Sequence, residues 1–209
     1  KALDLKRFDV DFAWTIDCCE LGEIVYENFN AAAAEIRFTS VTAHPMSSKG
    51  VLVNPLLMAT DYMSHFDRQQ TPEHTAGREG YVWFNGIQGD QNSTLLQASI
   101  RDFDLESFTR RKQQISEVAQ KIAAQYPTGK VEFHISDTYS NISNAIGEDR
   151  RAVDLMFEAM ESLGITPKPT PMRGGTDGAA LSAKGVLTPN FFTGAHNFHS
   201  KFEFLPLRA

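Results

Sequence analysis

The chain has 209 residues, of which 42% are hydrophobic and 22% charged, a composition typical of globular proteins that bury one full core or two small ones. Its formal net charge of −6 at pH 7 excludes a global positive field for nucleic acid or an anionic membrane, and no apolar run approaches the roughly 18 residues of a membrane-spanning helix. The only cysteines, Cys18 and Cys19, are adjacent, and because a disulfide between neighbours is strained they indicate a reducing compartment, so we expect a cytoplasmic protein.

The first predicted element is a strand at residues 8–16, "FDVDFAWTI", which is rich in aromatic and β-branched residues. Asp17 follows at its carboxyl end, the edge of an open α/β sheet where ligands bind. A strand-end aspartate also commonly caps a turn. The pattern alone therefore leaves a metal ligand and a turn cap as alternatives.

The following segment, residues 30–136, has the pattern of a complete small domain. Residues 34–41 alternate apolar and polar side chains, which predicts a strand buried on one face. A helix is predicted next, with Pro55 tolerated near its first turn. The residues at helical spacing in it are Val53, Leu56, Leu57, Thr60 and Met63. The runs 81–87 and 94–100 flank the turn formers of "QGDQNS" and predict a hairpin.

A long helix is predicted from its N-cap Asp104 to Tyr126, and a last strand at residues 130–135. The predicted core stripe of this helix is Phe108, Ile115, Val118, Ala119, Ile122 and Tyr126. The resulting order β-α-β-β-α-β is typical of a ferredoxin-like sandwich, an antiparallel sheet with two helices on one face.

The rest of the chain predicts a different, α/β arrangement. A helix is expected over "RRAVDLMFEAMESLG", closed by Gly164, and an apolar strand at "NFFTG". The simplest topology is an insertion. Residues 1–29 and 137–209 would then form one incomplete α/β domain, interrupted by the ferredoxin-like domain of residues 30–136.

The run "PMRGGTDGAAL", residues 171–181, combines both signs of charge with three glycines. Gly174, Gly175 and Gly178 would let the backbone approach a ligand closely, and Arg173 could bind a carboxylate through two hydrogen bonds. The alternative is a helix-capping turn with a surface arginine, because the lysine of a phosphate-binding loop is missing.

Several other polar residues are ambiguous by themselves. His199, in "HNFHSKFEF", is either a ligand on a loop after a strand or an ordinary loop histidine. His44 and Arg101 lie where predicted strands end, and each could equally be a surface residue. His65 and Asp67 have a metal-binding spacing, but they follow a helix whose dipole favours a histidine at its carboxyl end, so we do not expect a metal there.

Five stretches in order carry a resemblance: "WTIDCCELGEIVYENFNAA", "VTAHPMSSKGVLVNPL", "SIRDFD", "MRGGTDGAAL" and "NFFTGAHNFHSKFEF". Together they resemble the peptidase T family, bacterial tripeptidases within the aminoacylase-like co-catalytic zinc exopeptidases. The resemblance implies a zinc-peptidase α/β catalytic domain with an inserted ferredoxin-like lid domain. It also implies removal of the amino-terminal residue of tripeptides by a site that holds two zinc ions.

The resemblance implies that Asp17 binds one zinc and His199 the other. The family's remaining ligands and its glutamate base match nothing in this chain and would lie upstream of Lys1, so we expect a carboxyl-proximal part that is inactive by itself. Cys18 and Cys19 stand where glycines are usual, which leaves thiol ligands as a minor alternative.

The resemblance also implies which residues bind the peptide. The lid residues that would reach the substrate or its tetrahedral intermediate are His44, Asn54 and Arg101. The loop residues that would bind or surround the peptide carboxylate are Arg173, Gly175 and Asp177. In this family the lid commonly mediates a homodimer, and its histidine often serves the neighbouring subunit.

Two other interpretations remain open from the sequence. One is a non-catalytic module that binds peptides or dimerises, and the other is a related dipeptidase or N-acyl amino acid amidohydrolase. A chelator separates the first from the enzyme, since the module would bind peptides without metal. A substrate panel separates the second.

Overall fold

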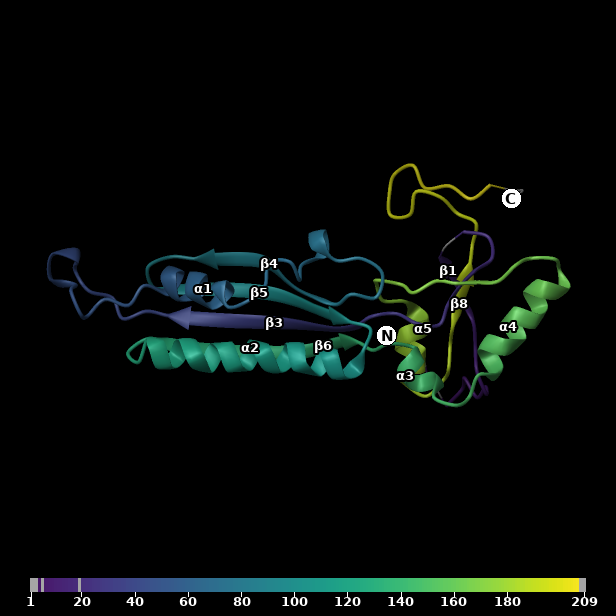
Figure 1. The fold of residues 1–209 in the computed structure, drawn as a ribbon, viewed down its shortest axis with the longest axis horizontal. Coiled ribbons are helices and arrows are strands. Elements are labelled where there is room, and N and C mark those ends of the chain that lie inside the picture. The colour runs from purple at the N-terminus through teal and green to yellow at the C-terminus, as the bar shows by residue number, and fades with distance from the viewer. Residues whose placement is uncertain (1–3, 5, 19, 207–209) are drawn as a thin grey trace. The chain divides into compact units, whose positions relative to one another are not determined.

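The computed structural model describes residues 4, 6–18 and 20–206, without the side chain of Cys18 (Figure 1). The chain divides into two compact units, each with its own four-stranded sheet and its own buried core. Unit 1 consists of Lys1–Phe29 and Tyr139–Ala209, and unit 2 of Asn30–Thr138. Within the described ranges, the structure has no helix that is long and apolar enough to cross a membrane.

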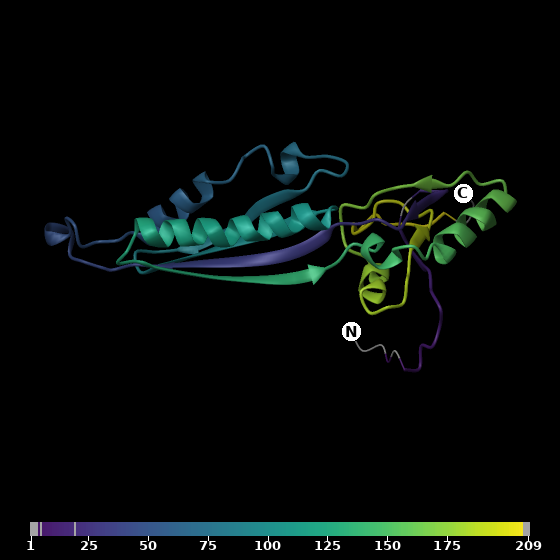
Figure 2. The same ribbon diagram turned by 60° about the horizontal axis from the view of Figure 1, so that its bottom comes forward.

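Unit 2 has the element order β-α-β-β-α-β. Its elements are β3 (Asn30–Thr39), α1 (Pro55–Ser64), β4 (Tyr81–Gly89), β5 (Ser93–Asp102), α2 (Leu105–Gln125) and β6 (Lys130–Tyr139), with the short 3-10 helices η1 (Pro45–Ser47) and η2 (Pro72–His74) in its loops. The strands lie in the order β4-β5-β3-β6, and Figure 2 shows α1 and α2 on one face of this sheet. The predicted ferredoxin-like domain is confirmed.

The β3 strand follows the predicted alternation. Ile36 and Phe38 are completely buried, whereas Glu35 and Arg37 between them are exposed. All ten residues of β3 pair with β5, from Asn30 opposite Asp102 to Thr39 opposite Ser93. A buried strand of this length fixes the register, because a slip by one residue would turn Ile36 and Phe38 to solvent.

The α1 helix buries a face that is rotated from the predicted one, and of the predicted residues only Val53 and Met63 pack, partly buried, against the core. Leu56 and Leu57 remain 41% and 57% exposed. The buried residues are Pro55, Met58, Ala59 and Tyr62. The Tyr62 ring lies 5.6 Å from the Phe38 ring, and its hydroxyl donates a 2.9 Å hydrogen bond to the Ile115 carbonyl. Tyr62, whose hydroxyl is hydrogen-bonded, thus determines which face of α1 is buried, because it brings more apolar area to the core than a leucine does.

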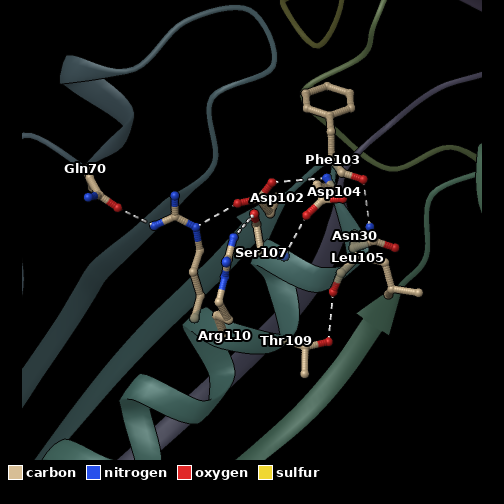
Figure 3. Close-up of polar contacts among 10 residues, drawn as sticks. Asn30, Gln70, Asp102, Phe103, Asp104, Leu105, Ser107, Thr109 and Arg110 are labelled. Carbon is tan, nitrogen blue, oxygen red and sulfur yellow. Dashed lines mark hydrogen bonds and ion pairs between the residues drawn. The ribbon is translucent and has the colours of Figure 1, made fainter.

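The predicted start of α2 is confirmed. Asp104 is the N-cap, and its carboxylate accepts a 2.7 Å hydrogen bond from the Ser107 amide. Figure 3 shows this start beside Asp102, a buried carboxylate that forms a 2.8 Å ion pair with Arg111 Nε. Arg111 also donates to Gln70 Oε1 at 2.7 Å, which ties the loop before β4 to the end of the sheet.

The α2 stripe is confirmed for five of its six predicted residues. Phe108, Ile115, Val118, Ala119 and Ile122 are buried, and Tyr126 is the C-cap and half-buried.

Unit 1 is built from short elements around a mixed sheet. They are β1 (Thr15–Cys18), β2 (Glu23–Val25), α3 (Ser143–Ile146), α4 (Arg151–Ser162), β7 (Lys168–Pro169), α5 (Asp177–Ser182) and β8 (Asn190–Phe192). The sheet order is β1-β8-β2-β7, with β1 parallel to β8 and β2 antiparallel to it. The predicted α4 is confirmed, and it ends before Gly164, whose positive φ of 73° suits a glycine.

The predicted first strand is wrong over most of its length. Only Thr15–Cys18 pair as a strand, and upstream of them Phe12 forms a single isolated bridge with Leu187. Asp9 and Asp11 are exposed, because an ionised carboxylate without a partner is costly to bury. Asp17 therefore lies inside β1 as its next-to-last residue, and not after the strand.

Candidate functional site

The parallel pair of β1 and β8 defines one edge of unit 1 (Figure 1). Thr15 lies opposite Asn190 and Cys18 opposite Phe192, so both strands end together. Since parallel neighbours end at the same edge, Asp17 and the loop that follows β8 leave the sheet on the same side. Asp17 is exposed there. The topology thus takes the aspartate and the chain segment that leads to His199 to the same edge of the sheet, from distant parts of the sequence.

The loop that carries His199 is a closed turn. His196 and Phe204 exchange backbone hydrogen bonds of 2.9 and 3.2 Å, and their rings stack with centroids 5.2 Å apart. His199 is exposed and has a positive φ of 62°, and its amide donates to Glu203 Oε2 at 3.0 Å. A left-handed backbone is unfavourable for a histidine by about 1–2 kcal/mol. Such strained residues cluster at functional sites.

The glycine-rich run is partly explained by packing within the protein. A Cβ atom on Gly175 would lie 2.7 Å from Cε1 of Tyr139, and one on Gly178 would lie 2.8 Å from Asn190 Oδ1. Only Gly174 has room, since the nearest atom to its Cβ would be Met172 Cγ at 4.0 Å. Two of the three glycines are therefore needed for close packing of unit 1, whatever the ligand.

The two charged residues of this run have defined environments. The Arg173 guanidinium carbon lies 4.9 Å from the Phe29 ring centroid, and Arg173 is half-buried. Asp177 is exposed and is the first residue of α5, where a carboxylate is favoured by the helix dipole. The preceding Thr176 caps α5 by accepting a 3.0 Å hydrogen bond from the Ala179 amide. The helix-capping turn considered from the sequence is thus present.

A buried polar network that the sequence did not reveal joins these parts. The Asn190 amide, which is completely buried, accepts a hydrogen bond from the Thr15 hydroxyl and donates to Thr176 Oγ1 at 3.0 Å. This Asn190 network connects β1, β8 and the start of α5. It holds together β1, which carries Asp17, the start of α5, which carries Asp177, and β8, which precedes the His199 loop. A single asparagine in an apolar run was the only signal for it.

In unit 2, the predicted substrate residues lie at opposite ends of the sheet. His44 and Asn54 belong to the loop after Thr39, whereas Arg101 pairs with Ala31 at the other end of β3. The eight steps from Ala31 to Thr39 span about 27 Å at about 3.4 Å per residue. Three residues of peptide reach at most about 11 Å. One copy of unit 2 cannot bring all three side chains to one tripeptide.

Each of these side chains also has a local role. His44 Nδ1 accepts a 3.2 Å hydrogen bond from the Met46 amide, and Asn54 Oδ1 caps α1 by accepting a 3.0 Å bond from the Leu56 amide. The bond to Nδ1 places the proton of the neutral imidazole on Nε2. Arg101 Nη1 donates to the carbonyls of Ala32 and Ile100 at 3.1 and 2.9 Å.

Asp17 and His199 are of the donor types that zinc accepts, a carboxylate oxygen and an imidazole nitrogen. Among the described residues, no three His, Cys, Asp or Glu side chains lie close enough to hold a metal ion together. The two residues fit as partial ligands, and a zinc would need further donors. His65 is the C-cap of α1, in line with its interpretation as a helix-end histidine. The thiols of Cys18 and Cys19 lie outside the described side chains.

The proteins that this chain resembles in sequence and in structure include peptidases and a peptidase domain. Residues 26–130 match the family model of the M20 peptidase dimerisation domain. A peptidase T-like protein of Yersinia pestis is 65% identical over 207 residues, which are 99% of this chain and 50% of that protein. The chain spans about half the length of the curated relatives it matches.

Solved structures share the fold. Aminopeptidase PepT from Bacillus cereus has a TM-score of 0.82 at 19% identity, over 98% of this chain and 55% of that one. A dinuclear metal-binding peptidase of the M20 family from Bacillus subtilis has a TM-score of 0.61 at 17% identity, over 91% of this chain and 50% of that one.

Proposed function

Because the chain belongs to the M20 peptidase family, we propose that it is the carboxyl-proximal part of a zinc-dependent aminopeptidase that releases the amino-terminal residue of tripeptides. The observation that carries the proposal is the parallel pairing of β1 with β8, which takes Asp17 and the His199 loop to one edge of the sheet. An active site assembled from strand ends is typical of open α/β sheets.

Asp17 and His199 would each hold one of two zinc ions. When bound, zinc lowers the pKa of a water molecule and polarises the peptide carbonyl. The strained backbone of His199 and the closed loop around it support a ligand role, because a metal site needs its imidazole held in one place. The other ligands and the general base would come from parts of the protein outside this chain.

Arg173 would bind the terminal carboxylate of the peptide. An arginine can form two parallel hydrogen bonds with a carboxylate, and the Phe29 ring beneath the guanidinium limits its movement. A Cβ atom on Gly174 beside it would meet only Met172 Cγ, at 4.0 Å, which supports close approach of a ligand on this side. Asp177 at the start of α5 would hold the loop. A carboxylate held at a fixed distance from the metals would select peptides by length.

His44 would act in the site of a second copy of the chain. The separation of His44 and Asn54 from Arg101 along β3 supports this, since the two ends of one sheet would then serve two sites. With Nδ1 occupied by the Met46 amide, the Nε2–H group of His44 is the donor available to a developing oxyanion. The homodimer implied by the dimerisation domain would be needed for activity.

The decisive experiment is an assay of the full-length gene product with zinc and a substrate panel. We expect tripeptides to be cleaved faster than dipeptides or N-acyl amino acids, and the 209-residue chain alone to be inactive. His199→Ala should lower zinc affinity about 100-fold or more, because the loss of a residue that only supports a metal ligand already costs about 10- to 100-fold. His134→Ala, which removes an exposed histidine of β6, is the matched control.

Two results would overturn the proposal. Equal zinc content and activity in His199→Ala and His134→Ala would remove the metal role. Peptide binding without turnover in the full-length product, unchanged by a chelator, would identify a binding module instead of an enzyme.

A further inference from the structure

Asn28 is a completely buried polar residue just before the chain leaves unit 1. Its backbone amide donates a 2.9 Å hydrogen bond to Asn141 Oδ1, and its own Oδ1 accepts a 2.7 Å bond from the Ile142 amide. Asn141, also buried, lies just after the chain has returned to unit 1. The outgoing and returning segments are therefore bound to each other through two asparagines.

The amide group of Asn28 adds a third segment. Nδ2 lies 3.0 Å from the Phe29 carbonyl, 3.3 Å from the Gly174 carbonyl and 3.4 Å from the Ser140 carbonyl. Since an NH2 group has two hydrogens, these three acceptors share them. One side chain thus holds the outgoing segment, the returning segment and the glycine-rich loop.

Asn28 and its neighbour Phe29 together hold the chain on both sides of Arg173. The Gly174 carbonyl follows Arg173 directly in the chain, and the Phe29 ring, one residue after Asn28, lies beneath the guanidinium. Before Arg173, the Met172 carbonyl accepts a 3.2 Å hydrogen bond from the Phe29 amide. The backbone around Arg173 and the ring under it are fixed by Asn28 and its neighbour.

We propose that Asn28 is a positioning residue that holds Arg173 for recognition of the free carboxylate of the substrate. This rests on the proposed function of Arg173. Asn28 does not touch the peptide. It acts through the Gly174 carbonyl and the Phe29 ring, so its loss should weaken the preference for a charged carboxyl end without changing the chemistry.

Asn28→Asp is the sharpest variant. The aspartate has the same size and can still accept a hydrogen bond from the Ile142 amide, but its second oxygen would face three carbonyl oxygens and repel them. Asn30→Asp is the matched control. Asn30 is equally buried and donates to the Phe103 carbonyl at 3.1 Å, but it belongs to unit 2.

The kinetic test compares a tripeptide with its carboxyl-terminal amide in the full-length gene product. Charge-assisted hydrogen bonds contribute enough that we expect KM for the free tripeptide to rise about 10- to 100-fold in Asn28→Asp, with kcat little changed. KM for the amide should stay as it was. Asn30→Asp should keep the preference of the unsubstituted enzyme.

Hydrogen exchange in the 209-residue chain gives a second readout that needs no substrate. Asn28→Asp should increase amide exchange at residues 172–176 relative to Asn30→Asp. If exchange is unchanged, or if the carboxylate preference survives in Asn28→Asp, the inference is wrong. If the unsubstituted enzyme itself does not distinguish the tripeptide from its amide, the carboxylate role proposed for Arg173 fails, and with it the recognition step assigned to Asn28.

Discussion

Gly178 offers a direct test of how tightly α5 packs in unit 1. In Gly178→Ala, the new Cβ would overlap the Thr188 carbonyl oxygen and lie 2.8 Å from Asn190 Oδ1 and 3.2 Å from Thr15 Oγ1. Overpacking of this kind costs about 1–3 kcal/mol, and the upper end applies because the nearest atom is backbone. An alanine inside a helix recovers about 1 kcal/mol relative to glycine. The net loss is about 2 kcal/mol.

The measurement is thermal unfolding of unit 1 followed by circular dichroism. For a unit of about 100 residues, 2 kcal/mol lowers Tm by about 8–16 °C. Gly174→Ala is the control in the same loop, since its Cβ would meet only Met172 Cγ at 4.0 Å. A Gly178→Ala protein whose Tm stays within about 2 °C of the control would refute the packing argument, and the glycine would then need a ligand to explain it.

Three further changes test other parts of the structure. Arg111→Met leaves the buried Asp102 carboxylate unpaired and should destabilise unit 2 by about 3 kcal/mol in urea unfolding, whereas Arg110→Met at an exposed ion pair should change little. Burial raises the pKa of Tyr62 above its usual value of 10.0. Above about pH 10 the unfolded chain therefore loses the Tyr62 proton before the folded chain does, and the stability of unit 2 falls as the pH rises. Tyr62→Phe should remove this part of the pH dependence of stability. Thr176→Ala removes the cap of α5 and should lower the free energy of unfolding of unit 1 by about 1 kcal/mol, measured by urea unfolding.

The elements that were predicted correctly are those whose structure follows from residues close together in the sequence. The alternation around Ile36 and Phe38 identifies β3 because its two faces meet different surroundings. In α2, Asp104 marks the first turn and a long apolar stripe marks the buried face, so both ends and orientation follow from adjacent residues. The ferredoxin-like fold rests on these two elements and the hairpin between them.

The sequence predictions were wrong where residues far away in the chain determine the local structure. The face of α1 depends on Phe38 and Ile115 receiving Tyr62, which spacing within the helix cannot show. The first strand is short because β8 pairs with only its last residues.

The candidate site was only partly accessible from sequence. Asp17, Arg173 and His199 stand in recognisable motifs, but Asn190 and Asn28 are single asparagines. The side-chain partners of Asn190 come from two distant segments, and those of Asn28 from three. The distance between His44 and Arg101 likewise follows from strand direction, which no motif contains.

The position of β3 next to β6 has an evolutionary consequence. These are the first and last strands of unit 2, and Figure 1 shows them running in opposite directions, so the unit begins and ends at neighbouring points. A gene rearrangement with two breakpoints, near Phe29 and Tyr139, could delete this unit or exchange it for another, and a short linker would rejoin the ends. Such a change would add or remove unit 2 in one step and leave the sheet and core of unit 1 in place.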